Sequence, residues 1–266
     1  MRRATITIPV YLPDWLHGAL QALRRTHEAA RRARLPVNLL GDRDIEWSWI
    51  SAHMPPGPGS ALDVGPGTSC LALMAAQRGF VVTAVDLQSA SWPYVHPRLR
   101  FTQGDVLTLA FPSGQFDLVI NCSTIEHVGL AGRYGVTHDR PDGDLQAMRR
   151  LADTMRPGGI MLLTVPVGRD AVFPPYCRVY GSARLPHLLE GYLVETETFW
   201  VKDQQNRWQP SDRQSALSFE AVAASAEPLS TVYALGCFAL RKPRWERGGD
   251  VHGGTAPVDG VEGPAC

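Results

Sequence analysis

Short apolar segments alternate with helix-like segments between residues 61 and 166, and this alternation constrains the fold more than any other feature of the sequence. Short apolar runs bounded by turn residues are typical of strands that are buried on both faces. Strands and helices that alternate at this spacing form right-handed βαβ units and a parallel sheet. The segments predicted as strands are 61–64, 80–85, 99–102, 116–120 and 160–165, and the predicted helices are 71–77 and 144–155.

After Pro186 the sequence continues with two further β-like segments. Polar and apolar side chains alternate over 192–200, and residues 231–240 form a long run rich in strand-forming residues. Two late strands with a helix between them would complete a seven-stranded sheet. We therefore predict an α/β fold, a Rossmann-like doubly wound seven-stranded mostly parallel sheet with helices on both faces. The sequence shows no internal repeat and no second domain.

The two ends of the chain differ in composition from its middle. Residues 1–35 contain seven arginines and two acidic residues, and residues 15–34 are typical of a helix. This basic segment is either the solvated face of a capping helix or a patch that guides an anionic substrate. Residues 243–266 have nine Gly or Pro and few apolar side chains, which predicts a disordered tail. We expect a helical cap over 1–55, one α/β domain over 56–242 and the tail over 243–266.

Charge and hydropathy disfavour several classes of protein. The 26 basic and 26 acidic residues balance, unlike those of a dedicated nucleic-acid-binding protein. No apolar run approaches the ~18 residues of a transmembrane helix, and Pro9 and Pro13 interrupt the place where a signal peptide would need its apolar core. The five cysteines form no C-x-x-C pair, which argues against a zinc site and a disulfide framework. We expect a cytoplasmic monomer or homodimer without nucleic-acid or membrane partners.

Polar residues end the predicted strands, where open α/β sheets bind their ligands. Asp63, Asp86, Asp105 and Asn121 stand at successive strand ends. Three carboxylates on one rim suit a ligand rich in hydroxyl and amine donors. A dinucleotide is less suited, because its G-x-G-x-x-G turn would need a third glycine where this sequence has Cys70, and because Asp63 would lie near its phosphates.

Five segments that include these strand ends resemble, in order, the motifs of class I S-adenosylmethionine-dependent methyltransferases. The match extends from residue 61 to residue 166, and it is specific for fold and cofactor but not for the methyl acceptor. The resemblance implies S-adenosyl-L-methionine as the cofactor. The segments are ALDVGPGT at 61–68, VDL at 85–87, QGDV at 103–106, FDLVINCSTIEH at 116–127 and MRPGGIMLLTVP at 155–166.

The resemblance assigns one group of residues to the methionyl part of the cofactor. Gly65 and Gly67 would let the backbone approach it, because a side chain there would collide. Asp63 would bind its amino group through water. Asn121 and Cys122 end the fourth strand and would lie beside the methyl donor.

The same resemblance assigns a second group to the ribose and the adenine. Asp86 would accept hydrogen bonds from both ribose hydroxyls, and Asp105 would accept one from the adenine amino group. Leu87 would cover one face of the adenine, and Val106 would donate its backbone N–H to the ring. Taken alone, Asp105 could also be a residue that merely forms a turn.

His127 is the first candidate for catalysis at the methyl acceptor. It follows the fourth predicted strand and should face the pocket, where it could act as a general base or position the acceptor. The alternative is that it caps the next helix or bonds to the backbone. Glu126, beside it, is expected to point elsewhere and to have a structural role.

His138 and Asp139 are further catalytic candidates in a glycine-rich polar segment before the next helix. Long polar segments at this place often form lids or contact substrates. The two residues could act together as a general base. With Asp142 they could form a metal site, although we expect no metal. For Asp142 and Asp144, capping of the helix N-terminus is the favoured interpretation.

Arg169, Arg178, Tyr180 and Arg184 follow the fifth predicted strand, and the first three are candidates for binding the acceptor. Arginines can hold a phosphate or a carboxylate, but surface salt bridges would explain them equally well. Together with the residues after His127, this block is similar to a poorly characterised group of methyltransferases that we associate with sugar and secondary-metabolite gene clusters.

These features lead to two hypotheses of function. The first is methyl transfer from S-adenosyl-L-methionine to a small molecule, with O-methylation of a sugar or natural product favoured. The second is a non-catalytic protein with this fold that binds S-adenosyl-L-methionine or a partner and has its acceptor side plugged. A nucleic-acid methyltransferase is disfavoured, because residues 121–124 are Asn-Cys-Ser-Thr and lack the Asn/Asp-Pro-Pro-aromatic motif.

Overall fold

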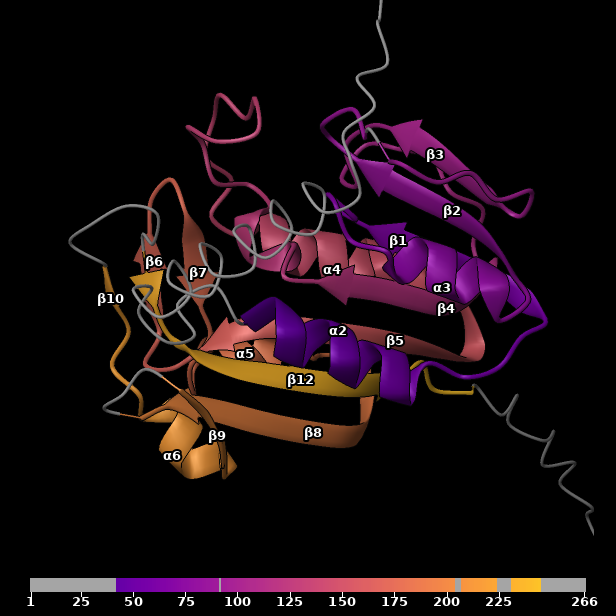
Figure 1. Cartoon of the computed structure of the whole chain (residues 1–266). Coiled ribbons are helices and arrows are strands. Elements are labelled where there is room, and N and C mark those ends of the chain that lie inside the picture. Colours follow the sequence, from indigo (N-terminus) through magenta and orange to yellow (C-terminus); the bar gives the residue numbers. More distant parts are fainter. Residues whose placement is uncertain (1–41, 91, 204–206, 224–230, 245–266) are drawn as a thin grey trace, which may run out of the picture.

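The computed structural model describes residues 42–90, 92–203, 207–223 and 231–244. Its centre is an eight-stranded sheet with the order β3-β2-β1-β4-β5-β12-β8-β9 (Figure 1). The helix predicted over 15–34 and nearly all of the predicted tail lie outside the described residues. The strands of the sheet are β1 (Gly59–Val64), β2 (Phe80–Asp86), β3 (Leu99–Gln103), β4 (Phe116–Cys122), β5 (Met155–Val167), β8 (Leu193–Lys202), β9 (Trp208–Ser211) and β12 (Ala234–Arg241).

The strand order confirms the predicted Rossmann-like, doubly wound fold. β1 pairs in parallel with β2 on one side and with β4 on the other. The chain therefore runs outward through β2 and β3 and returns to the middle of the sheet at β4. This reversal between β1 and β4 is the topological switch point, where such sheets bind ligands. β5 continues in parallel, whereas β12 lies antiparallel between β5 and β8.

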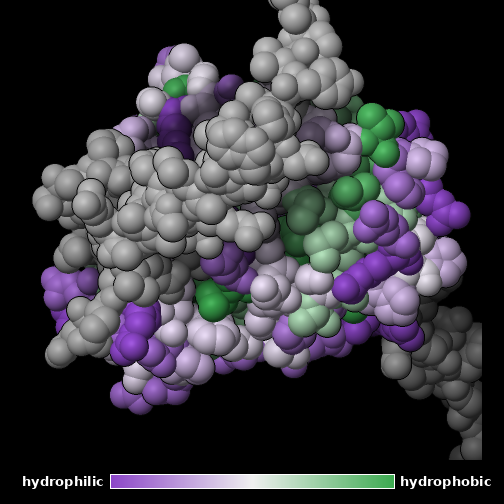
Figure 2. All heavy atoms as spheres, viewed as in Figure 1, coloured by the Kyte–Doolittle hydropathy of each residue, from purple (hydrophilic) through white to green (hydrophobic). Residues whose placement is uncertain are grey.

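The sheet has one strand more than the seven predicted. β9 pairs antiparallel with β8 at the edge of the sheet, where Gln209 lies opposite Val201. It has only four residues and contains Pro210, which a strand accepts at an edge. So short a segment carries no alternating pattern that identifies a strand. Figure 2 shows a largely hydrophilic surface over this side of the molecule, as is usual for an exposed edge.

Helices cover both faces of the sheet, as predicted (Figure 1). The central strands are buried on both sides, because neighbouring apolar side chains point to opposite faces: Leu118 and Ile120 of β4 belong to one core, and Val119 belongs to the other. No helix within the described ranges is both long and apolar enough to cross a membrane. On the first core lie α2 (Asp42–His53) and α3 (Leu71–Gln77), and on the second lie α4 (Gly143–Thr154), α5 (Arg184–Leu188) and α6 (Arg213–Leu217).

Short elements extend the carboxyl ends of β4 and β5. The 3-10 turn η1 (Ile125–His127) follows β4, and the hairpin of β6 (Ala171–Phe173) and β7 (Cys177–Val179) follows β5. A bridge between Val167 and Tyr180 ties the end of this hairpin to the end of β5. The hairpin therefore lies beside η1, above the edge of the sheet where ligands are expected. A further small hairpin joins β10 (Val222–Ala223) and β11 (Thr231–Val232).

Candidate active site

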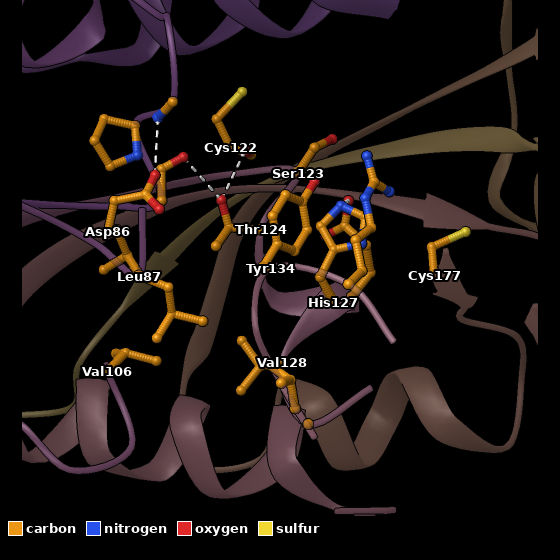
Figure 3. Close-up of a pocket in the computed structure, with 18 of the residues that line it drawn as sticks. Asp86, Leu87, Val106, Cys122, Ser123, Thr124, His127, Val128, Tyr134 and Cys177 are labelled. Atoms are coloured by element: carbon orange, nitrogen blue, oxygen red, sulfur yellow. Dashed lines mark hydrogen bonds and ion pairs between the residues drawn. The ribbon is translucent and has the colours of Figure 1, made fainter. Parts of the chain in front are cut away.

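A cavity of about 840 Å³ lies at the carboxyl ends of the parallel strands, beside the switch point. Small-molecule sites typically have ~300–1,000 Å³. Its walls come from the turn after β1, the ends of β2 and β4, the segments after β3 and η1, and the start of α2. Figure 3 shows Asp86, Leu87 and Val106 together on one side and Tyr134 beside His127 on the other. We call these the Asp86 side and the His127 side.

The turn after β1 needs glycine at two positions. Gly65 has a φ of +64°, and a Cβ there would collide with the side chain of Thr124. Gly67 has a φ of +50°, and a Cβ there would meet nothing within 4 Å. Such left-handed backbone favours glycine. Both residues line the cavity, so the turn presents bare backbone to whatever binds there.

The Asp86 side brings together the residues that the sequence predicts for ribose and adenine. Each of the two carboxylates accepts a hydrogen bond from the backbone N–H two residues further along, at 2.9 Å for Asp86 and 2.8 Å for Asp105. These bonds fix the turns that end β2 and β3. Leu87, whose exposed fraction is 38%, adds apolar surface next to them. The predicted residues that line this side are Asp86, Leu87, Asp105 and Val106.

Asp63 and Asn121 are not among the described residues that line the cavity, whereas Cys122 is. Asp63 is buried, and its Oδ2 atom has no hydrogen-bond partner among the described residues. Burial and the nearby charge of Asp86 raise the pKa of Asp63 to about 7. Asn121 Oδ1 accepts a hydrogen bond from the backbone of Ile125 at 3.2 Å and so shapes η1. The binding of a cofactor by Asp63 through water, and the place of Asn121 beside the methyl donor, stay predictions.

His127 lies at the end of η1 and lines the cavity, as predicted. Its Nδ1 atom meets the backbone carbonyl oxygen of Tyr176 in the β6–β7 hairpin. A carbonyl only accepts, so Nδ1 carries the proton and Nε2 keeps its lone pair. Burial, and then the charges of Arg133, Arg43 and Arg178, lower the pKa of His127 to about 4. The imidazole is therefore neutral at neutral pH.

Glu126 also lines the cavity, although the sequence led us to expect that it points elsewhere. Its side chain is 2% exposed, and its Oε2 atom has no hydrogen-bond partner among the described residues. Its Oε1 atom lies 3.6 Å from Nε2 of His127. Burial raises the pKa of Glu126 to about 8. A buried carboxyl group that is neutral at pH 7 thus stands beside a neutral imidazole.

The start of α2 contributes two residues that sequence reasoning missed. Arg43 lines the cavity, and its Nη1 atom lies 2.5 Å from Oε2 of the buried Glu46. Glu46 also accepts hydrogen bonds from the hydroxyls of Thr164, at 2.7 Å, and of Ser123. These bonds attach α2 to the ends of β4 and β5. The isolated sequence of α2 gave no signal for this role, because its partners are far away along the chain.

The two further catalytic candidates have different positions. His138 lines the cavity, and its Nδ1 atom lies 2.8 Å from the hydroxyl of Thr137. Asp139 is not among the described lining residues, and its carboxylate accepts a hydrogen bond from the backbone of Ala131 at 2.8 Å, which closes a turn. Within the described residues, no group of three or more His, Cys, Asp or Glu side chains is arranged to hold a metal ion.

The expected side-chain caps of α4 do not form. Asp142 is the N-cap residue, but its side chain makes no capping hydrogen bond. The carboxylates of Asp142 and Asp144 pair with Arg184 instead. Its Nη2 atom lies 3.2 Å from Asp142 and 2.6 Å from the buried Asp144. This ion pair joins the start of α4 to α5.

Arg178 and Tyr180, predicted to bind the acceptor, are buried and hold the fold together instead. Arg178 is 1% exposed and donates to the backbone carbonyls of residues 126, 128, 140 and 141, at 2.7 to 3.3 Å. The hydroxyl of Tyr180 donates to Asp144 at 3.1 Å. Arg169 is 69% exposed and lies 3.9 Å from Glu220. None of the three is among the described residues that line the cavity, so their positions correct this prediction.

Comparisons with known proteins agree with this architecture. Residues 107–220 match the model of a family described as Caenorhabditis protein of unknown function, DUF268. An uncharacterized methyltransferase of Mycobacterium bovis is 28% identical over 117 residues, which are 42% of this chain and 53% of that protein. The chain thus spans about half the length of the curated relatives it matches.

Two solved structures are similar over most of the chain. The N-methyltransferase NodS of Bradyrhizobium japonicum, solved with S-adenosyl-L-homocysteine, has a TM-score of 0.50 at 13% identity and covers 79% of this chain and 91% of its own. The protein BH2331 of Bacillus halodurans, assigned as a methyltransferase, has a TM-score of 0.50 at 16% identity and covers 75% and 99%. The chain therefore has the Rossmann-like methyltransferase fold, as the sequence predicted. A shared fold does not by itself define an activity.

Proposed function

We propose that this protein transfers a methyl group from S-adenosyl-L-methionine to a small molecule, and that the acceptor atom is a hydroxyl oxygen of a sugar or natural product. The observation that carries the proposal is that Asp86 and His127 line the same cavity. One side of this cavity suits the cofactor, and the other has a neutral imidazole where an acceptor would lie. The methyltransferases among the similar proteins support the same reaction class.

The residues of the Asp86 side fit the proposed cofactor. The carboxylates of Asp86 and Asp105 accept hydrogen bonds from hydroxyl and amino groups, as ribose and adenine require. Leu87 and Val106 offer apolar surface for a planar ring, and the open space at Gly67 lets a ligand approach the backbone. When bound, S-adenosyl-L-methionine supplies an electrophilic methyl group on a positively charged sulfonium.

The chain itself aligns the reactants. The hydroxyl of Thr124 shares its hydrogen between the carbonyl oxygens of Gly65, at 3.2 Å, and Cys122, at 3.1 Å, so the end of β4 contacts the glycine turn. Alignment of an acceptor with the methyl donor, with water excluded, can supply most of the acceleration of such a displacement. This contact holds the end of β4 beside the glycine turn, where the methyl donor would bind.

On the His127 side, two groups can receive the proton of the acceptor hydroxyl. Nε2 of His127 is available at neutral pH, but a base with a pKa near 4 is weak. His127 then acts mainly by accepting a hydrogen bond from the hydroxyl and so orienting its oxygen. Glu126 becomes a stronger base only above about pH 8, where its carboxyl group ionises.

Calorimetric titration with S-adenosyl-L-methionine, S-adenosyl-L-homocysteine and NAD tests the cofactor. We expect the first two to bind, and NAD bound in preference would overturn the proposal. Formation of S-adenosyl-L-homocysteine in the presence of small-molecule acceptors tests the reaction. A protein that binds the cofactor but forms no product with any acceptor would support the alternative, a non-catalytic binding protein.

A further inference from the structure

Three arginines line the cavity, and the charges of two of them, Arg43 and Arg133, act on His127. Arg43 comes from the start of α2, and Arg133 and Arg140 come from the segment between η1 and α4. Neither Arg133 nor Arg140 forms an ion pair with a carboxylate within the described part of the chain. These are not the arginines that the sequence singled out, since Arg178 and Arg184 serve the fold.

Arg133 is held beside His127 by an aromatic ring. Its guanidinium lies 4.6 Å from the centre of the Tyr134 ring, a cation–π contact. The ring of Tyr134 meets His127 edge-on, with 5.5 Å between the ring centres. The amide of Gln88 donates to the backbone carbonyl of Tyr134 at 3.0 Å, which attaches this segment to the end of β2. Guanidinium, phenol ring and imidazole thus follow one another along one wall.

Arg43 is held by a carboxylate of its own helix, Glu46. Its Nη1 atom bonds to Glu46, which the hydroxyls of Thr164 and Ser123 fix in the core. Its side chain is nevertheless 45% exposed. A guanidinium has five N–H donors in a planar fork, so a group held by one carboxylate keeps donors for another. Glu46 therefore positions Arg43 at the cavity.

The charges around His127 make this side of the cavity attractive to an anion. The largest charged influences on the pKa of His127 are Arg133, Arg43 and Arg178, and all of them are cationic. Asp42 at the start of α2 is the acidic lining residue here besides Glu126, whose carboxyl group is neutral below about pH 8. Asp86 and Asp105 lie on the other side. Basic side chains thus gather on the His127 side, and acidic side chains gather on the Asp86 side.

We propose that the methyl acceptor carries an anionic group, a carboxylate or a phosphate, that binds between Arg133 and Arg43. The inference rests on the proposed function, because it assumes that the His127 side takes the acceptor. An anion fixed there would hold the acceptor by two forked donors and leave its hydroxyl group near Nε2 of His127.

Three matched probes test this without knowledge of the natural acceptor: benzoate, phenyl phosphate and the neutral benzyl alcohol. Their binding to the full chain loaded with S-adenosyl-L-homocysteine is measured by ligand-observed NMR at constant ionic strength, because salt screens such contacts. We expect at least one anion to bind about tenfold more tightly than benzyl alcohol, since each contact involves a charged hydrogen bond. The better anion identifies carboxylate or phosphate as the preferred group.

Variants assign the binding to the proposed residues. Arg133→Gln and Arg43→Gln should each lower the affinity for the anion about tenfold. Arg149→Gln lies on the exposed face of α4, away from the cavity, and should leave this affinity unchanged. Arg43→Gln breaks the bond to Glu46 and can perturb the fold, so the exposed Arg133→Gln is the deciding variant. Equal binding of all three probes, or an Arg133→Gln protein that binds the anion normally, would overturn the proposal.

Titration of S-adenosyl-L-homocysteine into the same proteins separates this inference from the proposed function. If the unmodified protein binds S-adenosyl-L-homocysteine but neither anion, the anion site is wrong and the cofactor site stands. If it does not bind S-adenosyl-L-homocysteine, the proposed function itself is wrong. Arg133→Gln should retain normal affinity for S-adenosyl-L-homocysteine, because Arg133 lies on the His127 side.

Discussion

The carboxylate of Asp86 accepts a hydrogen bond from the backbone N–H of Gly67 across 3.2 Å (Figure 3). The two residues belong to different strand ends, because Gly67 is in the turn after β1 and Asp86 ends β2. A ligand that binds to this carboxylate is therefore placed against the glycine turn as well. This pair joins the ends of β1 and β2 into one preformed wall of the cavity.

Replacement of this carboxylate should weaken cofactor binding. We expect Asp86→Ala to reduce the affinity for S-adenosyl-L-homocysteine by about 1.5–3 kcal/mol, since it removes hydrogen bonds to a charged acceptor. Isothermal titration calorimetry measures the change directly. Asp44→Ala removes an exposed carboxylate of α2 that does not line the cavity and serves as the control. An unchanged dissociation constant for Asp86→Ala would exclude the ribose contact.

Removal of the imidazole should slow the reaction without loss of the cofactor. If His127 is the base, His127→Ala should lower the turnover number by about 10²–10⁴, and by less if it only orients the hydroxyl, measured as release of S-adenosyl-L-homocysteine with an acceptor of the anionic class. His127→Gln should retain part of the rate if the residue positions the hydroxyl. The exposed His187 offers a matched control, since His187→Ala leaves the cavity intact. Turnover near that of the unmodified protein would show that His127 has neither role.

The low pKa of His127 gives this prediction a pH signature. A histidine at its ordinary pKa near 6.5 would lose its neutral form below neutral pH, and the rate would fall with it. Burial lowers the pKa of His127 to about 4, so the neutral form persists from pH 8 down to pH 5. The His127-dependent part of the rate should therefore stay constant over this range and decline only near pH 4. A decline centred near pH 6.5 would contradict the buried position of the ring.

The centre of the sheet could be predicted because its strands are buried on both faces. Leu118, Val119 and Ile120 form a continuous apolar run, since neighbouring side chains enter opposite cores. The helix Leu71–Gln77 was predicted with its observed bounds. The short edge strand β9 could not be predicted, because its pairing with β8 depends on tertiary structure more than on local pattern.

The Asp86 side of the cavity was predictable for a topological reason. Parallel strands place their carboxyl ends at one edge, so residues that end β2 and β3 meet there whatever the details of the helices. The His127 side was less predictable. Glu46 reaches Thr164, which lies 118 residues away, and Ser123, which lies 77 residues away, and no local pattern indicates such contacts.

Arg178 illustrates why the sequence led us to predict buried arginines as residues that bind the acceptor. An arginine is almost never fully buried unless it is paired, so its presence after a strand indicates a surface or a ligand. Here the backbone carbonyls of residues 126, 128, 140 and 141 supply the acceptors, and they come together only in the folded chain. The same bonds place the segment that contains Tyr134 and Arg133.

This structural role predicts a large effect on stability. Arg178→Ala should lower the free energy of unfolding by about 3–5 kcal/mol, because it removes a buried cation beside Asp144 and leaves several buried carbonyls without their donor. Arg169→Ala should change it by less than about 0.5 kcal/mol, since Arg169 is exposed. Urea unfolding followed by circular dichroism measures both. Similar values for the two variants would mean that Arg178 is free to bind a ligand.

Glu126 should make the stability of the protein fall as the pH rises. Its pKa is about 8 in the folded chain and near 4.5 when exposed, so between these values the folded form keeps a proton that the unfolded chain has released. The stability associated with the neutral carboxyl group is complete below about pH 4.5 and is lost as the pH approaches 8. Glu126→Gln keeps a neutral side chain at every pH and removes this dependence.

The free energy of unfolding of Glu126→Gln should therefore improve relative to that of the unmodified protein, by up to about 1.4 kcal/mol per pH unit between pH 5 and pH 8. Other buried acids such as Asp63 titrate alike in both proteins and cancel in the difference. Urea unfolding at four pH values measures it, and Glu190→Gln, at an exposed position, should show a flat difference. A flat difference for Glu126→Gln as well would mean that Glu126 is ionised at neutral pH. Its pKa would then be near the ordinary 4.5, so its carboxylate would be about as weak a base as the imidazole of His127, and alignment of the reactants would have to supply most of the acceleration.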